Sequence, residues 1–214
     1  MWRSPLSILR SMCIRGVHSG RGIVFYGTLP NITGRINTKF LTDEAKKILN
    51  EPNAGGDSVR SEAYAMEVLK KHYHATDVTT EMNIVYYNPG WKKCDFLTTI
   101  SERVGVSVTR ALVDRKINPD TIDIALNSLI VKKLTGLIVS RAGVDPRQSF
   151  YKSILFVWSP DRISTNVFKC LFAKIGISNP LLTQDIVLIL TEVDEDYLRT
   201  DFRNVEGFNY VLIQ

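Results

Sequence analysis

Apolar and polar positions follow two different periods along the chain, and the change of period separates predicted helices from predicted strands. Apolar residues spaced by three and four indicate amphipathic helices, whereas short runs of β-branched and aromatic residues indicate strands. The helical pattern covers four segments: 43–49, 59–72, 120–141 and 162–175. The strand pattern covers five segments, 81–87, 93–100, 104–111, 152–158 and 185–191, with weaker signals at 22–27 and 208–213.

The order of these elements predicts a three-layer α/β fold. Turn sequences at Asn88-Pro89-Gly90 and Ser101-Glu102-Arg103 join the first three strands, which should therefore pair as an antiparallel meander. The nearly continuous apolar runs 152–158 and 185–191 are typical of strands covered on both faces. A crossover through helix 162–175 makes those two strands parallel. We expect a central mixed sheet, a three-strand meander plus parallel strands, with helices on both faces.

The first 22 residues differ from the rest in composition. They hold four arginines and four serines without an acid, and the first acidic residue of the chain is Asp43. Trp2, Leu6 and Leu9 are spaced as on one helical face. This pattern predicts a mitochondrial targeting leader at 1–22, followed by an N-terminal extension at 23–57 and an α/β domain at 58–214. A basic arm that binds nucleic acid is the alternative.

The basic charge of the chain is not evidence that the domain after the leader binds nucleic acid, and the apolar runs do not indicate a membrane span. Loss of the four leader arginines would lower the formal net charge from +5 to +1, so the basic balance belongs mostly to the leader. No apolar run is long enough to span a bilayer, because the best one, 129–139, is interrupted by Lys132 and Lys133. We expect both lysines on the solvent face of helix 120–141.

Three cysteines at unrelated spacings argue against a disulfide framework.

The order helix, three-strand meander, helix and strand between residues 59 and 158 resembles the PD-(D/E)XK, or restriction-endonuclease-like, nuclease superfamily. In active members an acid on the second strand and a Glu-x-Lys pair on the third strand gather around magnesium, often with a glutamate from the first helix. The resemblance implies that Asp95 and Glu62 hold the positions of the two acids. Glu62 borders the apolar stripe of helix 59–72, whereas Glu67 points away from it. Glu81 is a further candidate metal ligand.

The third strand departs from the family pattern. Ser107-Val108-Thr109 stands where Glu-x-Lys is expected, and strand alternation puts Ser107 and Thr109 on one face with Arg110 on the other. A magnesium site built on Asp95 and a neutral hydroxyl would be weak, since Mg²⁺ leaves its waters reluctantly. We therefore predict a degenerate active site. Its catalytic positions are Asp95, Glu62, Ser107 and Thr109, and its metal candidates, if magnesium binds, are Asp95, Glu62 and Glu81.

A second candidate surface is basic and aromatic. Trp91, Lys92 and Lys93 lead into the second strand, and with Arg110 they could stack on a base and contact phosphate. Each candidate also has a purely structural explanation. Trp91 could anchor an exposed turn, Asp95 could hydrogen-bond a neighbouring turn, and Glu62 could complement the dipole of its helix.

These observations predict a mitochondrial matrix protein that binds DNA or RNA, or serves in a nucleoprotein assembly, without catalysis. Two alternatives stay open: an active magnesium-dependent phosphodiesterase that uses Glu62, Glu81 and Asp95, and a structural protein that contacts no nucleic acid.

Overall fold

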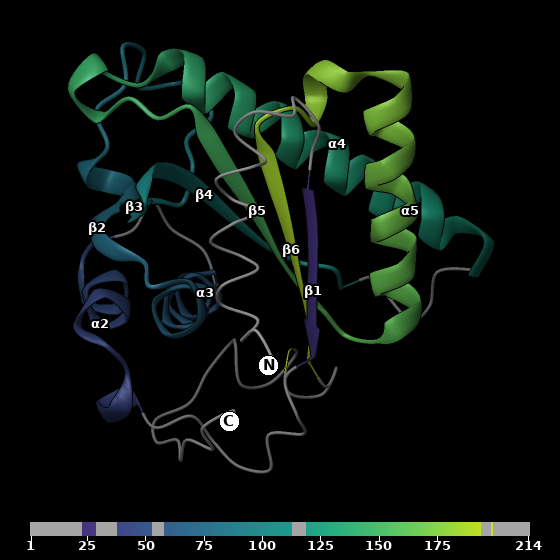
Figure 1. The fold of residues 1–214 in the computed structure, drawn as a ribbon, viewed down its shortest axis with the longest axis horizontal. Helices are drawn as coiled ribbons and strands as arrows, with labels where there is room; N and C mark the ends of the chain where they lie inside the picture. Colours follow the sequence, from purple (N-terminus) through teal and green to yellow (C-terminus); the bar gives the residue numbers. More distant parts are fainter. Residues whose placement is uncertain (1–22, 29–37, 53–57, 113–118, 194–197, 199–214) are drawn as a thin grey trace, which may run out of the picture.

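The computed structural model describes residues 23–28, 38–52, 58–112, 119–193 and 198. Within them a six-stranded sheet has the order β1-β6-β5-β4-β3-β2 (Figure 1). Strands β2, β3 and β4 pair antiparallel, whereas β4, β5, β6 and β1 run parallel to one another. The predicted mixed sheet, a meander plus parallel strands, is therefore confirmed. The strands are β1 (Ile23–Thr28), β2 (Thr76–Thr80), β3 (Phe96–Ile100), β4 (Glu102–Arg110), β5 (Lys152–Ser159) and β6 (Ile186–Glu192).

Helices cover both faces of the sheet, as the three-layer prediction requires. One face packs against α3 and α2, and the other packs against α4 and α5 (Figure 1). Each face has its own hydrophobic core, because alternate strand residues point to opposite sides of the sheet. The helices are α2 (Asp43–Asn50), α3 (Val59–Tyr73), α4 (Pro119–Gly143) and α5 (Arg162–Ser178). Short 3-10 turns span Thr38–Phe40, Glu81–Asn83, Pro146–Gln148 and Pro180–Leu182.

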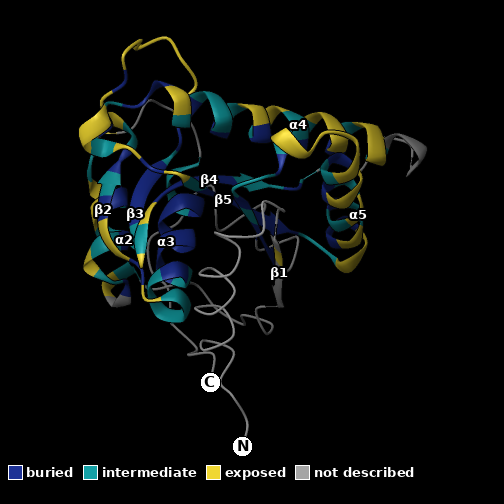
Figure 2. Cartoon of the chain, turned by 45° about the horizontal axis from the view of Figure 1, so that its top comes forward, coloured by how far each residue is buried: buried dark blue, intermediate teal, exposed yellow. Residues whose placement is uncertain are grey.

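Helix α3 packs against the sheet on one side and against α2 on another, so most of its residues are buried (Figure 2). Glu67 is only 2% exposed, and its Oε2 accepts hydrogen bonds from the backbone N–H and the hydroxyl of Thr42, at 2.8 and 2.7 Å. Its other oxygen pairs with Lys71 at 2.9 Å. The prediction that Glu67 points away from the core was wrong, because a second helix covers that side.

The segment predicted as the first strand, 81–87, lies outside the sheet. The meander begins instead with β2, whose polar sequence TDVTT gave no strand signal. Residues after the turn Glu81–Asn83 are extended but pair with the end of α4: Tyr87 N–H donates to Gly143 O, and Asp145 N–H donates to Val85 O, both at 2.9 Å. The alternation that resembled a strand is real, and it buries Ile84 and Tyr86 while Val85 and Tyr87 stay exposed.

Residues 23–28 belong to the same sheet as the rest of the fold. Strand β1 pairs with β6 from Ile23↔Val187 to Thr28↔Glu192, and α2 packs on α3. The described parts of the predicted N-terminal extension thus supply an edge strand and an outer helix. The predicted leader 1–22 and the weak strand signal at 208–213 lie outside the described residues. In the described part of the chain, no helix is long and apolar enough to cross a bilayer.

Candidate functional site

Strand β3 separates from β4 partway along its length, and the candidate site lies at this separation. Pairing of β3 with β4 begins at Phe96↔Val106, whereas β4 pairs with β5 as far as Arg110↔Trp158. Among the described strands, none pairs with residues 107–110 on the β3 side. Asp95 directly precedes β3, and its backbone N–H donates to Val106 O at 2.8 Å. Asp95 therefore sits where the two strands part.

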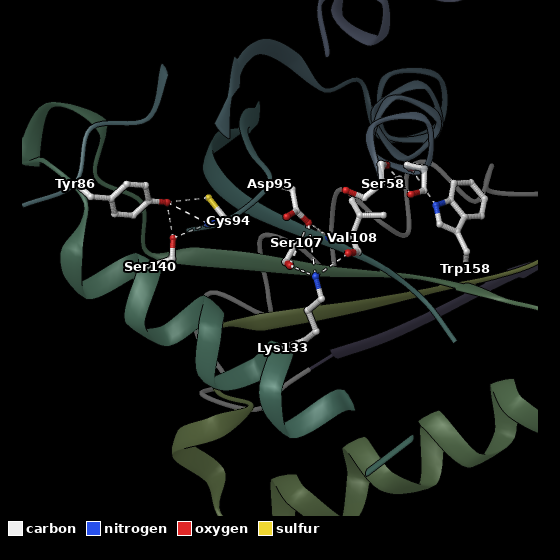
Figure 3. Close-up of polar contacts among 10 residues, drawn as sticks. Ser58, Tyr86, Cys94, Asp95, Ser107, Val108, Lys133, Ser140 and Trp158 are labelled. Carbon is white, nitrogen blue, oxygen red and sulfur yellow. Dashed lines mark hydrogen bonds and ion pairs between the residues drawn. The ribbon is translucent and has the colours of Figure 1, made fainter. Parts of the chain in front are cut away.

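Side chains supply the backbone contacts that a strand would otherwise make with Val108. The Asp95 Oδ2 atom accepts hydrogen bonds from the Val108 N–H and, at 3.2 Å, from the Ser107 hydroxyl. The Lys133 ammonium donates to Val108 O at 2.9 Å and to Ser107 Oγ at 3.2 Å (Figure 3). Its Nζ lies 3.9 Å from Asp95 Oδ2. We call Asp95, Ser107 and Lys133, with the Val108 backbone, the polar cluster.

Lys133 was predicted on the solvent face of the long helix, and this prediction was wrong. Its side chain is 27% exposed and points from α4 toward Asp95, whereas Lys132 is exposed as expected (Figure 3). The spacing contains the signal: Lys133 follows Ile130 by three residues and precedes Leu137 by four, and both are buried. Lys133 therefore lies within the apolar stripe of α4.

Glu62 approaches the same region from α3, on the other side of the sheet. It is 5% exposed. Burial raises the pKa of its carboxyl to about 7, and the charge of Asp95 adds to the shift, as does that of Glu81 to a smaller extent. A hydrogen bond with Ser58 and the charge of Lys133 oppose it. The structure thus brings Glu62, Asp95 and Lys133 within electrostatic reach of one another. A role for Glu62 as a helix-dipole partner does not by itself explain this placement.

The Asp95 carboxyl is held by one cation and two hydrogen-bond donors. Burial raises its pKa, while Lys133, the Val108 N–H and the Ser107 hydroxyl each lower it. The side chain keeps 19% exposure, so solvent still reaches part of it. The alternative was a hydrogen bond from Asp95 to a neighbouring turn, whereas its described partners, Ser107 and Val108, lie on β4.

The magnesium candidates Asp95, Glu62 and Glu81 do not come together as one ligand set in the described part of the chain. Among the described residues, no three histidine, cysteine, aspartate or glutamate side chains gather closely enough to hold a metal ion. Glu81 begins the 3-10 turn after β2 rather than opening a strand of the sheet. The oxygens of Asp95, Ser107 and Val108 face a cation that is already present, the Lys133 ammonium. A second, divalent cation would have to displace it.

The candidates on the third strand differ in whether they contact Asp95. Ser107 is buried, and its hydroxyl donates to Asp95 within the polar cluster. Thr109 is half-buried two residues further along β4, and the hydrogen bonds that hold Asp95 run to Ser107 and Val108 instead. Arg110 is also half-buried and, by strand alternation, shares the α3 face with Val108.

The basic and aromatic segment runs along the C-terminal half of α4. Trp91 packs one part of its ring on Gly143, where a Cβ would lie 2.3 Å from the ring atom Cε3. Lys92 lies beside Gly136, one turn after Lys132 and Lys133. Trp91 nevertheless keeps 44% exposure, and Lys92 is exposed. Trp91 is therefore both an anchor and an accessible ring.

A buried polar network fixes the chain between Trp91 and Asp95. Tyr86 Oη and Ser140 Oγ lie 2.7 Å apart, and the Cys94 N–H donates to both at 3.1 Å (Figure 3). Lys93 places its ammonium over the Tyr86 ring, 5.8 Å from the centroid, near the outer limit of a cation–π contact. Burial raises the pKa of the Cys94 thiol to about 11, which makes it a poor nucleophile at neutral pH. The network positions Asp95 and has no reactive group of its own.

Comparison with curated proteins gives a partial match. A curated protein of Dictyostelium discoideum, the "AAC-rich mRNA clone AAC4 protein", is 37% identical over 125 residues. The match covers 56% of this chain and 18% of that protein, so the chain spans less than a fifth of its relative's length. No protein-family model matches the chain, and no solved structure matches it.

Proposed function

We propose that this chain is a nuclease-like domain of the mitochondrial matrix that binds nucleic acid without cleaving it, by itself or within a nucleoprotein assembly. The observation that carries the proposal is the course of residues 91–95 along α4. It leaves an aromatic ring and a lysine exposed beside the basic positions of that helix, and it ends at the polar cluster.

The chemistry of this surface suits a flexible strand with accessible bases. An exposed ring offers a stacking face to any base, and stacking of this kind contributes about 1–3 kcal/mol per base. Tyr87 and Trp91 are 68% and 44% exposed, and the turn Asn88-Pro89-Gly90 separates them. Lys92 and Lys132 are exposed and supply positive charge for phosphate. Tyr87 was not a sequence candidate, because it was assigned to a strand.

We propose binding without cleavage because of the state of the carboxylates that could hold a metal ion. A magnesium-dependent nuclease needs carboxylates that are free to hold the cation which polarises the phosphate. Here Asp95 already accepts hydrogen bonds from Val108 and Ser107 and faces an ammonium. Glu62 is another nearby carboxyl, and its raised pKa leaves much of it protonated near neutral pH.

Binding is tested by fluorescence anisotropy of labelled single-stranded DNA and RNA with the full chain, from 20 to 300 mM salt. We expect salt-dependent binding that Trp91→Ala weakens by about five- to tenfold through lost stacking. Lys92→Ala should weaken binding and reduce the salt slope by about one. Lys174→Ala, the same change at an exposed position on α5, is the matched control and should leave binding intact.

The same reactions, run with Mg²⁺ or Mn²⁺ and analysed on gels, decide between the open alternatives. Uncleaved but bound nucleic acid supports the proposal. Metal-dependent cleavage that Asp95→Asn abolishes would replace it by an active phosphodiesterase. No binding at 20 mM salt would leave a structural role.

The location in the matrix is tested separately, since it rests on the composition of residues 1–22. A fusion of residues 1–30 to a fluorescent reporter should enter mitochondria. Replacing Arg3, Arg10 and Arg15 by glutamine should abolish import, because the positive charge of such leaders is required. A wild-type fusion that stays in the cytosol would overturn this part of the proposal.

A further inference from the structure

We infer that the Lys133 ammonium stands in the place of a divalent cation. The polar cluster therefore needs no metal ion. Removal of this one ammonium would create a divalent-cation site. The inference deepens the proposed function, since it concerns the same pocket and rests on that pocket being non-catalytic.

The first support is the set of atoms around Nζ. Lys133 Nζ contacts Val108 O at 2.9 Å and Ser107 Oγ at 3.2 Å, and Asp95 Oδ2 lies 3.9 Å away. A carbonyl, a hydroxyl and a carboxylate oxygen are the donor types that hard divalent cations take in proteins. An ammonium carries three N–H donors and no acceptor, so it suits the same three oxygens.

The second support is charge. When the Asp95 carboxyl is ionised, its charge and that of the Lys133 ammonium offset each other, so the cluster is close to neutral. A divalent cation that entered while Lys133 stayed in place would lie within a few ångströms of a positive charge, in a partly buried region where repulsion is poorly screened. The tethered ammonium is also always present at its site, whereas a free cation must be captured from solution.

The third support is that the backbone of Lys133 is fixed. Ile130, Leu134 and Leu137 on the same face of α4 are at most 1% exposed, so the helix cannot rotate to withdraw the lysine without opening the core. Only the side chain itself can leave. The cluster would then retain its three oxygens, with Glu62 close enough for its charge to interact with Asp95.

The test is a titration of Mn²⁺ with the full chain, in which electron paramagnetic resonance measures the remaining free ion. Wild type should show no saturable binding at millimolar Mn²⁺. Lys133→Met keeps the length of the side chain and removes the charge, and it should bind one Mn²⁺ at least about tenfold more tightly than wild type. Lys132→Met, the exposed neighbour, should behave as wild type. Adding Asp95→Asn to Lys133→Met should abolish the gained site.

Two results would overturn the inference. One is stoichiometric Mn²⁺ binding by the wild-type chain that Asp95→Asn removes, a result that does not depend on the folding of any lysine variant. The other is a folded Lys133→Met, shown by circular dichroism, that gains no site. Neither result depends on nucleic-acid binding, which is measured separately in EDTA; a failure to bind there would remove the proposed function and leave the Mn²⁺ result standing.

Discussion

Replacing Asp95 by alanine is expected to lower the free energy of unfolding by about 2–4 kcal/mol. The change removes the acceptor of the Val108 N–H and the carboxylate opposite Lys133. A largely buried backbone donor then loses this acceptor, and a partly buried ammonium loses the carboxylate beside it. The exposure that both charged side chains retain keeps the expected loss toward the lower end. Urea denaturation at pH 7.5, followed by circular dichroism, measures it.

Asparagine at the same position separates the two contributions. Asp95→Asn keeps an oxygen that can accept from Val108 and removes only the charge, so its loss should be about half that of alanine. Asp123→Asn, on an exposed part of α4, controls for the change in net charge. Equal losses for alanine and asparagine would show that the charge pair alone matters, and no loss for alanine would contradict the bridging role of Asp95.

The chain should become more stable as the pH falls from 8 to 6, and Glu62 should be the cause. A carboxyl whose pKa is about 7 in the folded chain and near 4.5 when unfolded binds its proton more tightly in the folded state. Its stabilising effect is complete below pH 4.5 and is lost as the pH rises through 7. The full difference amounts to about 3 kcal/mol, of which about 1 kcal/mol falls between pH 8 and 6.

Glu62→Gln should flatten this pH dependence and make the chain more stable than wild type at pH 8 by about 2–3 kcal/mol. The amide resembles the protonated acid but carries no charge to desolvate. The measurement is a series of urea curves from pH 6 to 8, a range above the ordinary titration of most carboxyls. A wild-type slope that persists in Glu62→Gln would assign the dependence to another group.

The helices and buried strands were predictable because their periods were long and regular. Helix α4 was expected at 120–141 and runs from Pro119 to Gly143, and β5 and β6 lie within two residues of their predicted bounds. Strand β2 could not be recognised, since an edge strand needs to bury only one face and its residues are mostly polar. The alternating segment 84–87 was mistaken for it, because pairing with the end of a helix leaves the same pattern as pairing in a sheet.

The candidate site was predictable only in part. Helical spacing and the family resemblance placed Glu62 and Asp95 near each other, and the structure brings their charges within reach. Lys133 was missed although its spacing from Ile130 and Leu137 put it on the buried face of α4. A lysine in such a stripe needs a counter-charge, and the partner depends on where β3 leaves β4. That point is a property of tertiary packing, which no local pattern of residues encodes.

The strand separation has a consequence for how the molecule behaves in a crowded solution. Where β3 departs, residues 107–110 of β4 would otherwise offer backbone donors and acceptors in the middle of the sheet to any strand that could insert. Asp95 occupies the N–H of Val108 and Lys133 occupies its carbonyl. One carboxylate and one ammonium thus occupy the Val108 backbone that a neighbouring chain could otherwise pair with, at a place that no described strand covers.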